Sequence, residues 1–174
     1  MTTNLEESAR LAGSHAWMER RLFEILGGWV ATTSEHAAKL LFDRHSSHHA
    51  WRARQWWDRL PVLADTDRQA LAGSAVPAMA PALEQLAGLD TTVARLAGAY
   101  RFALPRLWSG YQSHVGSAGG PSDGSSLRTL QILLPDVTSD WQEGEALLQN
   151  LLAGRDEVLV ASSTVEALEV TLLQ

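Results

Sequence analysis

The stretch SEHAAKLLFDRHSSHHAWRARQWWDRLP, residues 34–61, decides the fold because its apolar positions recur with the period of an α-helix. At about 100° per residue, one face carries Ala38, Phe42, His45, His49, Arg52, Trp56 and Leu60. This is the face expected to be buried, yet it holds two imidazoles and a guanidinium. An unpaired polar group in a core costs roughly 1–3 kcal/mol, and an unpaired charge costs more. The stretch therefore predicts a helical protein with a polar centre.

The residues before this stretch predict another helix, over residues 5–30. Its apolar line is Leu11, His15, Met18, Leu22, Leu26 and Trp29, at spacings of three and four. The connection to the helix predicted over 34–60 is very short, which favours two antiparallel neighbours. Ser34 is the expected N-cap of the helix over 34–60.

The second half of the chain predicts a similar pair of helices, over residues 91–115 and 123–153. Pro105 and Pro135 lie inside them and should kink or divide them. Residues 61–90 form a long connection between the two pairs, and the tail predicts an extra helix over 157–172 that packs on the bundle or on a second copy. The expected fold class is all-α, an up-down four-helix bundle in a single domain, 1–174.

The composition excludes several classes of function. The chain has no cysteine, so disulfides, thiolate catalysis and cysteine-based metal sites are absent. The formal charge is −6 and the basic residues are spread out, so nucleic-acid binding is not expected. No apolar run is long enough to span a membrane, and the N-terminus lacks the basic residues of a signal peptide. We therefore expect a cytoplasmic protein without a membrane partner.

Two pairs of candidate metal ligands have the same spacing on the first two predicted helices. His15 and Glu19 are four residues apart, as are His45 and His49, so each pair stacks on one helix face. In an antiparallel hairpin the two pairs are expected to converge near mid-height. Three imidazole nitrogens and a carboxylate suit one zinc or iron ion. One candidate function is therefore an enzyme with a single Zn or Fe ion as its cofactor.

The same polar residues also fit a structural network or a ligand pocket. Glu19 can pair with Arg52, and the imidazoles can hydrogen-bond to one another, to Tyr100 or to Tyr111. A pocket for a small-molecule ligand is expected to be lined by Arg52, Trp56, Tyr100, Tyr111 and Asp140. On this interpretation the protein binds a small ligand or is a structural or partner subunit, using its tail or tryptophan-rich end for protein contacts.

The predicted layout resembles the ferritin-like superfamily, with two helix pairs, a long connection between them and polar residues turned inward. Catalytic members carry a carboxylate on helices one and three and Glu-x-x-His on helices two and four. Glu19 matches the carboxylate of helix one, but the chain contains no Glu-x-x-His, and residues 93–115 contain neither Asp nor Glu. The resemblance implies a ferritin-like fold without the di-iron centre, similar to members that act as structural partners of a catalytic subunit.

A second helical family, the DinB-like group, binds a metal through three histidines and needs His-x-x-x-His late in the bundle. Here that pair lies in the second predicted helix, so the ferritin-like resemblance ranks higher. The apolar tail has no assigned contact in such a bundle. We therefore expect a homodimer or a protein partner.

Overall fold

The computed structural model describes residues 5–62, 67–119 and 123–174. Within these residues every regular element is a helix and no strand is present, so the predicted all-α class is confirmed. The elements in chain order are α1 (Leu5–Val30), α2 (His36–Trp57), α3 (Arg68–Leu71), α4 (Met79–Ala87), α5 (Thr92–Ala97), the π-helix η1 (Gly98–Ala103), α6 (Leu104–Ser117), α7 (Gly124–Leu151) and α8 (Arg155–Leu172).

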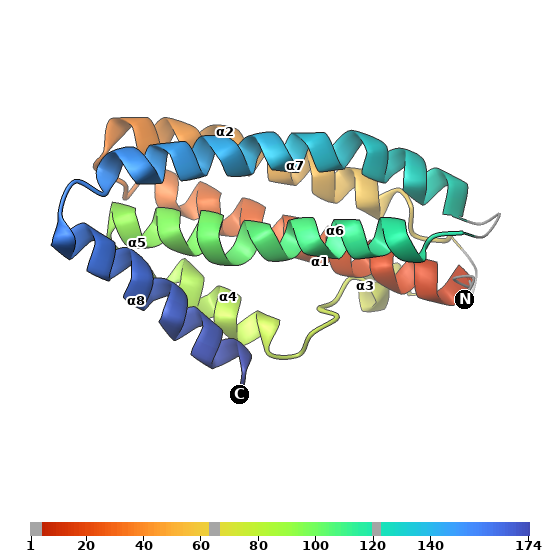
Figure 1. Ribbon diagram of the computed structural model, residues 1–174. Helices are drawn as coiled ribbons and strands as arrows, with labels where there is room; N and C mark the ends of the chain where they lie inside the picture. The colour runs from red at the N-terminus through yellow and green to blue at the C-terminus, as the bar shows by residue number, and fades with distance from the viewer. Residues whose placement is uncertain (1–4, 63–66, 120–122) are drawn as a thin grey trace.

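The helices α1, α2 and α7 and the continuous segment α5–η1–α6 lie side by side around a common interior (Figure 1). α1 contacts α2 and α6, and α7 likewise contacts α2 and α6. In Figure 1, α2 and the segment α5–η1–α6 run in the same direction, because α4 carries the chain back along α1. The long connection expected between the two helix pairs is present, whereas the expected up-down alternation is not, since α2 and the segment α5–η1–α6 are parallel.

The face of α2 that the sequence predicted to be buried is buried in the structure, its polar residues included. Fully buried side chains on it include His45, His49 and Arg52. The helix begins one residue later than expected. Glu35, and not Ser34, is the N-cap, and its carboxylate accepts a hydrogen bond from the amide of Ala38 at 2.6 Å.

The helix predicted over 91–115 is present, but it changes geometry before Pro105. Thr91 caps α5 through a hydrogen bond from the amide of Ala94 to its hydroxyl at 3.2 Å. The turns from Gly98 to Ala103 are π-helical. Pro105 has no N–H to give to the carbonyl four residues earlier, so the wider turn precedes the proline as an alternative to a sharp kink. Pro135 lies within α7, which remains a single helix.

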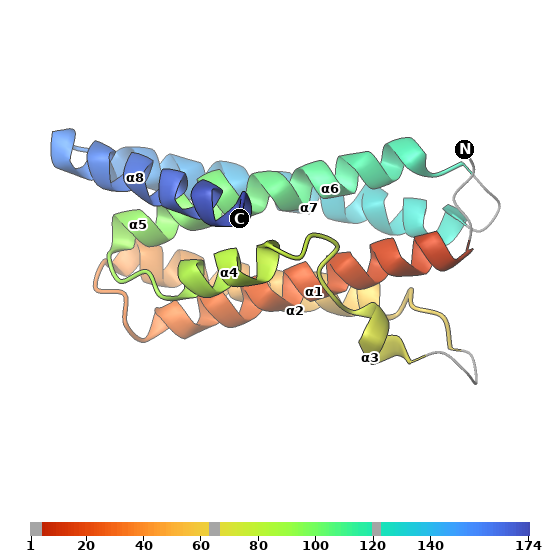
Figure 2. The same ribbon diagram turned by 90° about the horizontal axis from the view of Figure 1, so that it is seen from below.

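The tail helix α8 packs on its own chain. It contacts α4, α5 and η1 and buries Ala161 and Leu168. α8 and α4 together cover one side of the molecule (Figure 2). Among the helices that the structure describes, none is both long enough and apolar enough to cross a membrane.

Candidate functional site

Glu19 of α1 lies at the centre of the polar interior and is completely buried. Its carboxylate accepts hydrogen bonds from the Nε of Arg52 at 2.9 Å and from the Tyr111 hydroxyl at 2.5 Å. The Nδ1 of His49 lies 2.5 Å from its other oxygen. These partners come from α2 and α6, so the buried carboxylate of Glu19 joins α1 to both of these helices.

Arg52 links the Glu19 carboxylate to two further carboxylates, both on α7. Its Nη1 lies 2.8 Å from Oδ2 of Asp140 and 2.5 Å from Oδ2 of Asp136. The Arg52 side chain is fully buried, as is nearly all of Asp140, whereas the side chain of Asp136 is 37% exposed. The guanidinium therefore serves as the cation of the interior, held by carboxylates from opposite sides of the bundle.

The charged states of Glu19 and Arg52 follow from their contacts. Burial raises the pKa of the Glu19 carboxyl, but the charges of Arg52 and His49 and the hydrogen bonds from His49 and Tyr111 outweigh it, so the net pKa is lowered. Burial disfavours the charged guanidinium, but Glu19 and Asp140 raise the pKa of Arg52 overall. Both groups are therefore ionised at neutral pH.

His49 lies between the two members of the pair as a neutral imidazole. Burial lowers its pKa, and this effect exceeds the opposing influence of Glu19. Its Nδ1 lies 2.5 Å from Oε2 of Glu19, which can only accept, so the neutral ring carries its proton on Nδ1 and donates it to that carboxylate. Its Nε2 is buried and has no hydrogen-bond partner among the described residues.

An aromatic cluster around His15 lies further along the interior and is connected to Glu19 through Tyr111. The Nε2 of His15 lies 3.2 Å from Nδ1 of His114, and its ring centroid lies 4.7 Å from that of Trp56. Burial, followed by the charge of His114, lowers the pKa of His15 to about 3. The indole of Trp56 donates to the Tyr111 hydroxyl at 2.7 Å. This cluster is a packed, hydrogen-bonded part of the core.

His45 belongs to a third group, together with His48 and Asp140. The Nδ1 of His45 lies 2.8 Å from the Tyr100 hydroxyl, and its Nε2 lies 3.5 Å from oxygens of both Asp140 and Glu143. The Nδ1 of His48 lies 2.8 Å from Oδ1 of Asp140. Burial lowers the pKa of His45 to about 3, so its imidazole is neutral at pH 7.

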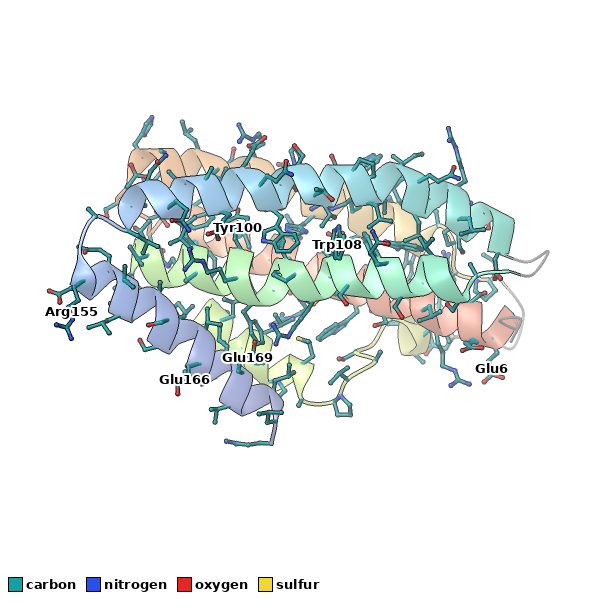
Figure 3. All side chains as sticks on the ribbon, viewed as in Figure 1. Glu6, Tyr100, Trp108, Arg155, Glu166 and Glu169 are labelled. Atoms are coloured by element: carbon teal, nitrogen blue, oxygen red, sulfur yellow. The ribbon has the colours of Figure 1, made fainter. Side chains whose placement is uncertain are left out.

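An apolar groove of about 1140 Å³ lies between α7 and the segment formed by η1 and α6. Its walls include the indoles of Trp108 and Trp141, whose ring centroids are 6.1 Å apart, and the prolines at 105 and 135. Figure 3 shows Tyr100 and Trp108 extending from the η1–α6 segment toward α7. Tyr100 thus connects the groove with His45.

The four residues predicted as metal ligands are all buried, but they do not form one ligand set. Glu19 and His49 are in contact, whereas His15 pairs with His114 and His45 lies in the third group. Within the described ranges, one group of three His, Asp or Glu side chains has its potential ligand atoms close enough to share a metal ion. It consists of His45, His48 and Asp140.

The residues predicted to line a ligand pocket also separate. Tyr100 lines the groove, while Arg52, Trp56, Tyr111 and Asp140 are hydrogen-bonded to core neighbours. His48 and Glu143 were not predicted as site residues. The signal that identifies them is a pair of i, i+3 spacings, His45 with His48 on α2 and Asp140 with Glu143 on α7.

Comparison with models of protein families, with curated proteins and with solved structures finds no match to this chain.

Proposed function

We propose that this protein is a divergent ferritin-like bundle that binds a small, planar, largely apolar molecule in the groove between α7 and η1–α6. In this account it does not carry out di-iron chemistry. The observation that carries the proposal is the groove itself, with two neighbouring indoles on its walls and Tyr100 at its base.

The chain path and the polar interior support the ferritin-like part of the proposal. Ferritin-like bundles have one long crossover, and here α2 and α5–η1–α6 run in the same direction after such a connection. Their metal ligands project inward from facing helices. In this protein Arg52 lies among the inward carboxylates and supplies the positive charge, so the carboxylates have a fixed cation without a metal pair.

The chemistry of the groove supports an apolar ligand. Its volume is close to the range of roughly 300–1,000 Å³ that is usual for small-molecule sites. Several of its polar groups pair with each other: Arg101 binds Glu145 through two hydrogen bonds, and the Trp108 indole donates to the Thr138 hydroxyl at 3.2 Å. The surface left for a ligand is therefore mainly aromatic and aliphatic, and it favours stacking with a flat ring.

Titration with the neutral fluorescent probe N-phenyl-1-naphthylamine tests this function. We expect saturable binding at one site per chain, weakened at least tenfold by Trp108→Ala and by Trp141→Ala. Trp51→Ala is the matched control, because Trp51 is 47% exposed on α2 and does not line the groove. Equal binding by all variants, or no saturable binding by the wild type, would overturn the proposal.

A cytoplasmic homodimer completes the proposal. Leu159 and Val170 fall on one line of α8, and their side chains are 53% and 50% exposed. Sedimentation of the wild type and of Leu159→Glu tests this part. A dimer that dissociates in the variant supports it, and a monomeric wild type at the same concentration contradicts it.

A further inference from the structure

We infer that His45, His48 and Asp140 form a binding site for one divalent transition-metal ion of the Zn²⁺ or Fe²⁺ type, with Glu143 available as a fourth ligand. This inference goes beyond the proposed groove function and does not depend on it. It also differs from the ligand set expected from the sequence, because His15, Glu19 and His49 take no part.

The first argument is an imidazole nitrogen that lacks a partner. His45 is completely buried, and its Nε2 has no hydrogen-bond partner among the described residues. A buried polar atom left unpaired destabilises the fold, because it has lost its hydrogen bonds to water and gained none in return. This nitrogen is directed at two carboxylates, with Asp140 Oδ1 and Glu143 Oε2 both at 3.5 Å. A metal ion between them would satisfy the nitrogen and both oxygens at once.

The second argument is the geometry of the donor atoms. One potential ligand atom each from His45, His48 and Asp140 lies within 4.8 Å of the other two. Metal bonds of about 2.0–2.2 Å to nitrogen and oxygen at a tetrahedral angle place ligand atoms roughly 3.4 Å apart. The His45–Asp140 separation of 3.5 Å already fits this value, and the His48–Asp140 separation of 2.8 Å needs a small outward shift.

The donor types also fit such an ion. Two imidazoles and one carboxylate are suited to Zn²⁺ and to non-haem Fe²⁺, whereas Mg²⁺ and Ca²⁺ prefer oxygen ligands alone.

Neighbouring side chains hold two of the ligands in place. With a metal on Nε2, the proton of His45 resides on Nδ1, from which it is donated to the Tyr100 hydroxyl 2.8 Å away. Asp140 is oriented through its other oxygen, Oδ2, which accepts from Arg52 Nη1 at 2.8 Å. Oδ1 is thereby turned toward the two histidines. Such supporting contacts are the usual surroundings of a metal ligand.

The local charge favours a cation. Four carboxylates face two guanidinium groups in this part of the bundle, a formal excess of two negative charges with the histidines neutral. These groups are Glu19, Asp136, Asp140 and Glu143, against Arg44 and Arg52. A divalent ion would neutralise this excess.

The third group is also reachable from solvent, in contrast to the Glu19 centre. The side chain of His48 is 38% exposed and that of Glu143 is 47% exposed. Glu143 is held in an ion pair by Arg44, which is itself half exposed and can release it. Glu19 has no such freedom, because both of its oxygens already accept hydrogen bonds from buried donors.

Titration of untagged, metal-free protein with Co²⁺, followed by the visible absorption of the bound ion and by calorimetry, tests the site. We expect one Co²⁺ per chain, displaced by Zn²⁺. His48→Ala should weaken binding at least tenfold, while leaving the fold intact because His48 lies partly in solvent. His36→Ala is the matched control, an exposed histidine at the start of the same helix, and it should change the affinity less than twofold.

A further variant separates this site from the one expected from the sequence. His15→Ala should retain Co²⁺ binding, because His15 contacts His114 and Trp56 and not the third group. The inference is overturned if the wild type binds no Co²⁺ stoichiometrically, if His48→Ala binds as tightly as the wild type, or if His15→Ala abolishes binding in a folded protein. Circular dichroism of each variant establishes that it is folded.

Discussion

Arg52 and Glu19 form a fully buried ion pair, with Nε of Arg52 2.9 Å from Oε1 of Glu19. The pair joins α2 to α1, and the other end of the guanidinium binds Asp136 and Asp140 on α7. A buried ion pair stabilises a fold only when its remaining hydrogen-bonding groups are satisfied. Here the carboxylate also accepts from Tyr111, so the pair is part of a satisfied network.

Replacing Glu19 with Gln should lower the free energy of unfolding by roughly 1–3 kcal/mol, because an amide has one acceptor oxygen for three buried donors. Urea denaturation measures the change. Glu24→Gln on the same helix is the control, since Glu24 pairs with arginines at the surface and should contribute less than about 1 kcal/mol. Binding of Co²⁺ should remain in Glu19→Gln. Its loss from a folded variant would mean that Glu19 is a metal ligand.

Replacing Arg52 with Gln should cost more, about 3–5 kcal/mol, because it leaves buried carboxylates without a cation. Arg54→Gln provides the comparison, since Arg54 and Asp58 form an ion pair whose side chains are 72% and 45% exposed. Thermal and urea unfolding of the two variants measure the difference. An Arg52→Gln protein as stable as Arg54→Gln would show that the guanidinium does not organise the interior.

Replacing Gly144 with Ala should displace Tyr100, since an added Cβ would lie 2.2 Å from an atom of its ring. Such overpacking typically costs about 1–3 kcal/mol, and it should also disturb the groove that Tyr100 lines. Gly28→Ala is the control, because nothing lies within 4 Å of its added Cβ and alanine favours a helix by up to about 1 kcal/mol. Wild-type stability and probe affinity in Gly144→Ala would contradict this packing.

Acid should destabilise the protein as the pH falls below about 6.5, where histidines of the unfolded chain become protonated. In the folded chain the pKa of His15 and that of His45 are about 3, so the folded protein resists this protonation. The resulting stability is fully present above pH 6.5, and is lost as the pH falls toward 3. The lowered pKa of Glu19 adds a further loss below its unfolded value of 4.5.

Unfolding measured in urea at several pH values checks this dependence. Each buried histidine should contribute up to about 1.4 kcal/mol per pH unit. His15→Gln should reduce the slope between pH 6 and 4.5 by up to about this amount. An identical slope in wild type and His15→Gln would show that His15 takes up its proton in the folded state.

The helical period was enough to place the buried face of α2, because one stripe of side chains on a long helix is a strong signal. It was not enough to say which buried groups meet. His15 and Glu19 both face inward, but they lie about one helical turn apart along α1. They therefore form hydrogen bonds with different partners, His114 and Tyr111. His48 was missed because its imidazole lies at the edge of the stripe, and its role emerges only from the position of Asp140 on α7.

The groove could likewise not be predicted from the residue pattern of any single helix. Trp141 is half-buried, and its ring centroid lies 6.1 Å from that of Trp108 on a helix far away in the sequence. The two prolines were recognised as helix disturbances, while the meeting of Pro105 and Pro135 at one groove depends on how α6 and α7 are aligned. Alignment of helices far apart in sequence is set by side-chain packing and leaves no local signal.

The measurement that tests this account most directly is anomalous X-ray diffraction from crystals of the protein soaked in Co²⁺. We predict one anomalous peak between Nε2 of His45, Nδ1 of His48 and Oδ1 of Asp140, with the guanidinium of Arg52 still bound to Glu19. A peak between Glu19 and His15, or a pair of peaks with Arg52 displaced, would contradict the account and restore a metal centre at the middle of the bundle.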